Sequence, residues 1–203
     1  MNSTTDIISL INFLSLVISI GTFGILYIIS LQPMKRSRTR GEKAWEESKQ
    51  YRMIGGFLEL VSVINIILWI WFPLPAIGDW KISEQFWVGI VIGVFILVPC
   101  VSIMTKGMID AGSESLAPSQ ENEMYGGIYK YIRHPQTIGE FPIYVALAFM
   151  VNSWFLVFFA TICIIIYIPI MIYYEEKDLV LRFGDKYREY QKTTGALFPK
   201  FRK

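Results

Sequence analysis

The residues best able to do chemistry lie together in one tripeptide, Arg133-His134-Pro135. Proline lacks a backbone N–H and suits the first turn of a helix, so a helix is expected to begin there. Arg133 and His134 then lie at a helix N-terminus, where free N–H groups favour a carboxylate or phosphate. The preceding Gly126 and Gly127 allow a positive φ and a close approach of the backbone to a ligand. The spacing leaves an alternative open, in which Arg133 extends its charge to the membrane surface and His134 caps the helix.

Four glutamates occupy unusual positions in apolar sequence. Glu59 lies inside one apolar run, and Glu140 is the only ionisable residue inside another. A carboxylate in a membrane helix is costly, so it is expected to face a partner or a polar cavity. For Glu140 this means either a pair with Arg133 or a place in a polar pocket. Glu175 and Glu176 follow a further apolar run, where they either bind a ligand or are solvated.

The counts of histidine and cysteine exclude several kinds of chemistry. His134 is the single histidine, which rules out zinc hydrolysis through a two-histidine helix motif. Cys100 and Cys163 both lie in apolar runs and are interpreted as buried or lipid-facing residues. The sequence therefore predicts no metal site and no disulfide framework, and no nucleic-acid partner is expected.

The elements that must position these residues are apolar. Of the 203 residues, 53% are hydrophobic and 18% charged, and the charges are unevenly spread. Stretches of about 20 residues with almost no charge are long enough to cross a bilayer as helices. Five apolar runs occur, at 7–31, 54–72, 86–104, 137–151 and 154–174. We interpret the first as a retained helix, and the fourth is short enough to reach only part of the way. The predicted fold class is an all-α polytopic membrane protein with five transmembrane helices.

The basic residues predict the orientation. With the N-terminus outside and the C-terminus in the cytoplasm, 18 of the 19 lysines and arginines lie on the cytoplasmic side. We therefore expect a multi-pass protein of the cell membrane with its active site on the cytoplasmic side. Residues 1–104 would form three helices and a basic loop, 33–52, that attracts anionic lipid. Residues 105–203 would form a catalytic portion, with a cofactor loop at 105–136, a helical hairpin at 137–174 and a C-terminal helix and tail at 175–203.

The tail has the pattern of an amphipathic helix. Leu179, Phe183, Tyr187 and Tyr190 recur at i, i+4, i+8 and i+11, which places them on one helical face. Gly184 weakens such a helix but is tolerated within it. The pattern predicts one cytoplasmic helix, which either contributes to the site or only lies at the interface.

These motifs together resemble the isoprenylcysteine carboxyl methyltransferase superfamily, which includes phospholipid N-methyltransferases. The resemblance runs from Tyr125 to Phe201, and its layout is similar to that of the small prokaryotic, archaeal members. Its motifs are Arg133-His134-Pro135, Gly139, Glu175-Glu176, Phe183-Gly184-x-x-Tyr187-x-x-Tyr190 and Phe198-Pro199. The resemblance implies an integral membrane enzyme that uses S-adenosylmethionine and releases S-adenosylhomocysteine. Its partners would be membrane lipids and a lipophilic methyl acceptor, prenylcysteine carboxylate-like or phospholipid amine-like, that enters from the bilayer.

The resemblance also implies a cofactor pocket formed by the tripeptide segment, the hairpin and the C-terminal helix. The catalytic candidates are Arg133, His134 and Glu176. Candidates for cofactor binding are Gly127, Tyr129, Tyr131, Arg133, His134, Pro135, Gly139, Glu140, Glu175, Glu176, Phe183 and Tyr187. Arg133 suits the cofactor carboxylate, because charge-assisted hydrogen bonds are strong. Glu175 or Glu176 suits the amino group or the ribose hydroxyls.

The remaining roles are assigned by chemical type. Three aromatic side chains would pack the adenine: Tyr129, Tyr131 and Phe183. His134 would hydrogen-bond cofactor or substrate, or act as a base for an amine acceptor.

Two departures from the family pattern concern the acceptor. Thr137 stands where the family often has a tyrosine, and residues 191–194 lack the arginine of the carboxyl-methylating members. Glu140 directly after Gly139 also fits an Arg-His-Pro-x-x-x-Gly-Glu pattern of membrane sterol reductases, which bind NADPH. That class, and a membrane protein without enzymatic activity, remain as alternatives.

Overall fold

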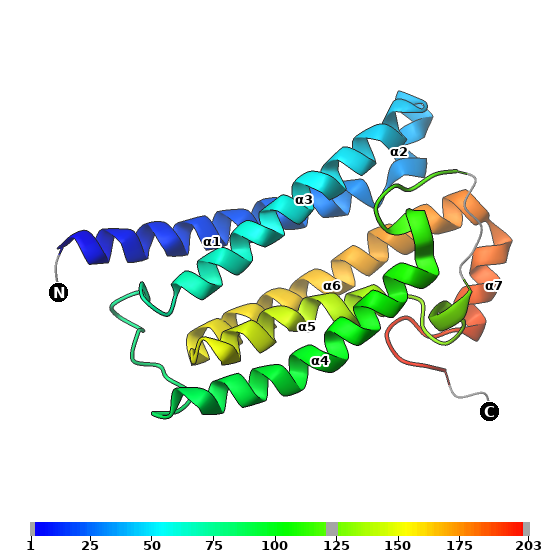
Figure 1. Cartoon of the computed structure of the whole chain (residues 1–203). Coiled ribbons are helices and arrows are strands. Elements are labelled where there is room, and N and C mark those ends of the chain that lie inside the picture. Colours follow the sequence, from blue (N-terminus) through cyan, green and yellow to red (C-terminus); the bar gives the residue numbers. More distant parts are fainter. Residues whose placement is uncertain (1–2, 121–125, 201–203) are drawn as a thin grey trace.

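The computed structural model describes residues 3–120 and 126–200, and every regular element within them is helical (Figure 1). Tyr125 and Phe201, at the two ends of the resemblance, lie outside the described residues. The helices are α1 (Ser3–Ser30), α2 (Pro33–Arg40), α3 (Lys43–Leu68), α4 (Phe86–Ala111), α5 (Pro135–Met150), α6 (Trp154–Phe183) and α7 (Asp185–Thr193). Two short 3-10 turns, η1 (Gly112–Ser115) and η2 (Gly127–Lys130), lie between α4 and α5. The predicted all-α class is confirmed.

Four of these helices are long and apolar enough to cross a bilayer: α1, α3, α4 and α6. Helix α5 has 16 residues. At 1.5 Å per residue it is about 24 Å long, less than the roughly 30 Å of a hydrocarbon core. It begins at Pro135, as the sequence predicts, and lies between α4 and α6 (Figure 1). The molecule is therefore a membrane protein with four helices of spanning length and a shorter helix among them.

The expectation of one amphipathic helix through the tail is wrong. Helix α6 continues to Phe183, so it includes Glu175 and Glu176, and Gly184 then adopts a φ of +60°. This left-handed conformation favours glycine and ends a helix. The chain turns there and α7 folds back beside the start of α5 (Figure 1). Tyr187 and Tyr190 still lie on one face of α7, but the turn at Gly184 determines the direction in which this face points.

Helices α4 and α5 pack in close backbone contact because small residues lie between them. A Cβ added at Gly139 would lie 2.4 Å from the Met104 nitrogen and 2.6 Å from the Cys100 oxygen. One at Gly93 would lie 2.6 Å from the Ala146 oxygen. Small residues permit such approaches between membrane helices. Gly139, expected to bind cofactor, therefore serves to seat α5 on α4.

Helix α2 is attached to α6 at the end of the bundle where α7 lies. The Asp178 carboxylate accepts hydrogen bonds from the backbone nitrogens of Met34 (3.1 Å) and Lys35 (2.7 Å). Free N–H groups at the start of a helix need such acceptors. Nearby, an apolar cluster joins α1, α5 and α6 through Phe23, Leu31, Phe141 and Met171. These contacts fix the helices that surround the site.

We predict that Gly139→Ala lowers the stability of the protein by about 1–3 kcal/mol, because the new methyl group must displace α4 backbone. Gly21→Ala is the matched control, since a Cβ at Gly21 meets nothing within 4 Å. Thermal unfolding of both variants in one detergent measures the difference. Equal midpoints for the two variants would contradict the close contact.

Candidate active site

A polar cavity opens at the end of the bundle where α7 folds back. Five residues from the predicted set line it: Tyr129, Arg133, His134, Glu175 and Tyr187. It is also lined by residues that the sequence did not single out as site residues, among them Tyr27, Arg52, Glu114, Gln136, Asp178, Arg182 and Tyr190. The walls come from α1, α3, α5, α6 and α7, with η1 and η2 closing one side. Titratable groups from distant parts of the sequence thus meet in one place.

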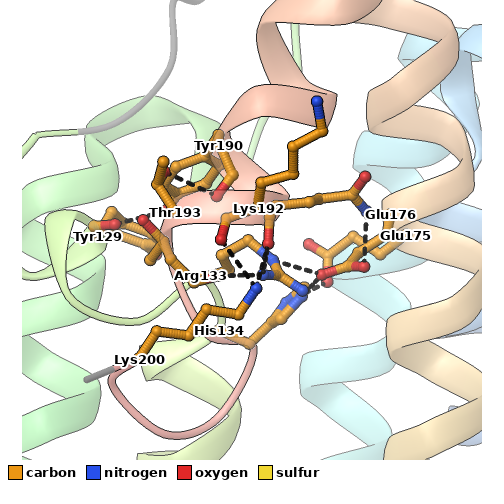
Figure 2. Close-up of polar contacts among 11 residues, drawn as sticks. Tyr129, Arg133, His134, Glu175, Glu176, Tyr190, Lys192, Thr193 and Lys200 are labelled. Carbon is orange, nitrogen blue, oxygen red and sulfur yellow. Dashed lines mark hydrogen bonds and ion pairs between the residues drawn. The ribbon is translucent and has the colours of Figure 1, made fainter. Parts of the chain in front are cut away.

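Arg133, His134, Glu175 and Glu176 form one connected network beside the cavity (Figure 2). Glu176 Oε1 accepts from Arg133 Nε at 2.7 Å and lies 3.0 Å from His134 Nε2. The other ring nitrogen, Nδ1, lies 3.0 Å from Glu175 Oε2. The three catalytic candidates are therefore in direct contact, and Glu175 completes the group.

The imidazole of His134 is a cation in this network. Burial favours its neutral form, but the Glu175 carboxylate and the hydrogen bonds to Glu175 and Glu176 outweigh this and raise the pKa of His134 to about 9. Both ring nitrogens then carry protons and donate to carboxylates. At neutral pH His134 has no free lone pair, so this geometry disfavours a role as base for an amine.

Arg133 holds the C-terminal segment against the start of α5. Its Nη1 donates to the carbonyl oxygens of Thr194 and Gln191, the latter at 3.2 Å. The Arg133 backbone nitrogen donates to the Gly195 carbonyl oxygen (2.9 Å), and the His134 backbone nitrogen donates to the Ala196 carbonyl oxygen (3.0 Å). The backbone N–H groups of Arg133 and His134 are thus occupied by the chain itself and are not available to a ligand anion. Arg133 is a link between the cavity and its C-terminal wall.

Three tyrosines supply neutral hydroxyl groups to the cavity. Tyr190 donates to the Tyr129 carbonyl, and Gln136 Nε2 donates to the Tyr129 hydroxyl at 2.9 Å. Burial raises the pKa of Tyr129 and of Tyr187, and it raises the pKa of Tyr190 to about 12. The phenols are therefore un-ionised at neutral pH and can serve as hydrogen-bond partners of a ligand.

Arg182 and Arg52 hold the segment 112–120 at the cavity, as Arg133 holds the C-terminal segment. Arg182 contacts the Glu114 carboxylate with both terminal nitrogens, at 2.5 and 3.2 Å, and donates to the Ser119 carbonyl. Arg52 donates to the carbonyls of Glu114 and Ser115. The sequence does not predict these contacts, because most of the acceptors are backbone carbonyls. The one available signal was the position of Arg52, just before the apolar run at 54–72.

Several predicted residues lie elsewhere. Tyr131 is 67% exposed, and Phe183 packs under the Arg182 guanidinium at 4.7 Å, so neither lines the cavity. Gly127 has a φ of +57°, and a Cβ there would meet Asp110, which accepts from the Ile128 nitrogen. This glycine fixes the loop on α4. Glu140 was expected either to pair with Arg133 or to lie in a polar pocket, and it does not pair with Arg133. Pro135 is the first residue of α5.

The long apolar helices with a polar, charge-lined cavity at one end define a polytopic membrane protein with a candidate enzymatic site. The sequence profile of phospholipid methyltransferases matches residues 85–186, which include α4, α5 and α6. The chain belongs to this phospholipid methyltransferase family, a family of membrane methyltransferases, as the motifs around Arg133 and Glu176 predict.

Two relatives carry more specific names. The chain is 32% identical to "Methanethiol S-methyltransferase" of Pseudomonas deceptionensis over 152 residues, 70% of this chain and 56% of the relative. It is 24% identical to "Methanethiol S-methyltransferase 1" of Bradyrhizobium diazoefficiens over 193 residues, 86% of this chain and 65% of the relative. The chain therefore spans less than two thirds of the length of either relative.

We predict that His134 titrates near pH 9 in the folded protein. Its folded pKa lies above the reference value of about 6.5, so its contribution to stability is complete below pH 6.5 and is lost as the pH rises through about 9. Because the chain has one histidine, ¹⁵N-histidine NMR follows this titration without overlap. Glu175→Gln should shift the midpoint towards 6.5, whereas the exposed Glu189→Gln should not. A wild-type midpoint near 6.5 would refute the assigned network.

We predict that Arg133→Ala frees the C-terminal segment before it unfolds the bundle. Hydrogen exchange followed by mass spectrometry should show residues 187–196 losing protection at least tenfold, because each charge-assisted bond contributes about 1.5–3 kcal/mol. Protection in α1 and α3 should be retained. Arg188→Ala, which removes a side chain that pairs only with an exposed Asp185 among the described residues, is the control. Uniform loss of protection would show a global role instead.

Proposed function

We propose that the chain transfers a methyl group from S-adenosylmethionine to a lipophilic acceptor, with the cofactor in the polar cavity. The observation that carries this is the donor set of the cavity. Arg52 lines it, and its hydrogen bonds to the carbonyls of Glu114 and Ser115 both use Nη1. A guanidinium has five N–H donors, so Arg52 has further donors that fit the carboxylate of a ligand.

The other groups of the cavity fit the rest of the cofactor. Glu175 and Asp178 supply carboxylates for an amino group and ribose hydroxyls, and Tyr187 and Tyr190 supply aromatic surface and neutral hydroxyls for the adenine. Arg133, His134 and Glu176 act by holding Glu175 and the C-terminal wall in place. In this proposal Arg52 takes the role first expected of Arg133.

S-adenosylmethionine, when bound, supplies a methyl group that an attacking atom takes from its sulfonium sulfur. Such a displacement needs little covalent help, so the protein contributes by orientation and by exclusion of water. The segment 112–120, held by Arg52 and Arg182, lines one side of the cavity and limits its contact with bulk water. The network around His134 keeps its charges balanced while it fixes Glu175 at the wall.

A second cavity supports a lipophilic acceptor. It has a volume of about 330 Å³ and lies between α1, α5 and α6. Its lining is almost entirely apolar, with Phe23, Phe141, Leu156, Phe159 and Ile164 among its residues. These helices belong to the membrane part of the molecule, so an acceptor would reach the cavity from the bilayer. Prenylcysteine-like and phospholipid-like acceptors fit this route, and so does the small thiol named for the two relatives.

We also propose the finer topology. With α5 as a fifth, short span, the N-terminus lies outside, and 18 of the 19 basic residues lie on the cytoplasmic side, as does the polar cavity. Residues 1–104 then form the membrane support, and residues 105–203 the catalytic portion in the cell membrane.

The proposal predicts that S-adenosylhomocysteine stabilises the purified protein in detergent. At 100 times its dissociation constant it should add about 2.7 kcal/mol, which a thermal shift detects. Arg52→Gln should weaken binding about tenfold or more in calorimetry, through the loss of a charge-assisted bond. The exposed Arg38→Gln is the control. Stabilisation by NADPH instead of S-adenosylhomocysteine would favour the reductase alternative and overturn the proposal.

A further inference from the structure

The polar cavity does not include one pair of carboxyl groups, Glu59 of α3 and Glu140 of α5. Their side chains are in hydrogen-bonding contact with each other. Tyr144 Oη lies 3.4 Å from Glu59 Oε1 and donates to it. Two carboxyl groups can form a hydrogen bond only if at least one of them is protonated, because two adjacent negative charges repel. With one proton between them, the pair has one carboxylate that is free to take up a second proton.

The helix register places this pair between the two cavities. On α5, Thr137 lines the polar cavity, while Phe141 and Tyr144 line the apolar one. Residues three and four apart share a helix face, so Glu140 lies on this stripe between them. On α1, Tyr27 lines the polar cavity, and Phe23 and Gly24, one turn earlier, line the apolar cavity. The two cavities thus lie end to end along the same helices, with Glu140 at their junction.

Charged and titratable groups that face the pair come from the neighbouring helices. Tyr27 on α1, and Tyr167 and Glu175 on α6, lie within electrostatic range. Tyr144 belongs to α5 itself. The aromatic hydroxyls are neutral donors, and Glu175 is held by His134. Glu59 and Glu140 are therefore the groups at this junction that can accept a proton.

We propose that the Glu59–Glu140 pair accepts the proton of a neutral acceptor, a thiol or an amine, as the acceptor is methylated. This inference rests on the proposed methyl transfer and specifies the acceptor class. The apolar cavity would bind the alkyl part of the acceptor, with its sulfur or nitrogen towards Glu140. A carboxylate acceptor is disfavoured, because its charge would face a pair that is already negative.

The step balances for a thiol. The S–H bond breaks, and its proton passes to the free carboxylate oxygen of the pair. The sulfur electron pair forms the new bond to the methyl carbon. The bond from that carbon to the sulfonium sulfur breaks, and its electron pair stays on the sulfur of the departing cofactor product. The pair, now with two protons, releases one to water in the polar cavity and returns to its starting state.

The test uses the purified full chain in detergent and three probes of equal length: 1-hexanethiol, 1-hexylamine and hexanoate. Wild type should methylate the thiol or the amine, and whichever reacts identifies the acceptor atom. Glu59→Gln and Glu140→Gln should each reduce the rate at pH 7 about 100-fold, as expected for loss of a general base. The thiol deficit should shrink to less than about tenfold at pH 9, where solution supplies more thiolate.

Calorimetry with S-adenosylhomocysteine separates this role from a structural one. Both variants should bind it within threefold of wild type, as should the control Glu46→Gln, an exposed residue on the same helix as Glu59. A pH-independent deficit, an unchanged rate, lost cofactor-product binding in the variants, or methylation of hexanoate alone would overturn the inference while leaving the proposed function intact. A wild type that does not bind S-adenosylhomocysteine would overturn both.

Discussion

The whole site depends on the pairing of charges that are removed from water. Glu176 lies in α6 at the end of a long apolar helix, where an unpaired carboxylate would be very costly. It is satisfied by Arg133, His134 and the Gln191 amide at 2.8 Å. Arg133 and His134 lie directly before α5 and Gln191 lies in α7, so one largely buried charge fixes the start of α5, the end of α6 and α7 relative to one another. The contacts that hold α5, α6 and α7 together therefore also form this wall of the cavity.

The second constraint is the close contact of α4 with α5. Gly139 and Gly93 let the two backbones touch, and this brings Asp110, at the end of α4, under the loop that carries Gly127. The loop in turn places Tyr129 in the cavity. Small residues in the membrane part thus determine the position of an aromatic side chain at its edge. This chain of contacts explains why glycines near the site need not touch a ligand to matter for it.

The sequence predicts the class and the family motifs well, because long apolar runs and the Arg133-His134-Pro135 tripeptide are local signals. It also predicts the start of α5, which proline dictates. It does not predict the turn at Gly184, since a glycine in an amphipathic pattern is compatible with either a weakened helix or a helix end. Nor does it predict that Arg52 and Arg182 close the cavity, because most of their acceptors are backbone carbonyls of the segment 112–120. Contacts to backbone leave no mark in the pattern of side chains.

The charges around them give the Glu175–Glu176 pair and the Glu59–Glu140 pair different roles. The Arg133–His134–Glu175–Glu176 network carries two positive and two negative charges when His134 is protonated, so it adds no net charge beside a bound sulfonium. A neutral network can fix positions, but it has no capacity to take up a proton without breaking its own bonds. In our proposal the Glu59–Glu140 pair has that capacity, because it holds one proton and lies apart from Arg133, which holds the C-terminal wall. A nucleophile that loses a proton needs such a group, whereas one that is already ionised does not. The presence of the second pair in a membrane interior, where carboxyl groups are costly, is best explained by that need.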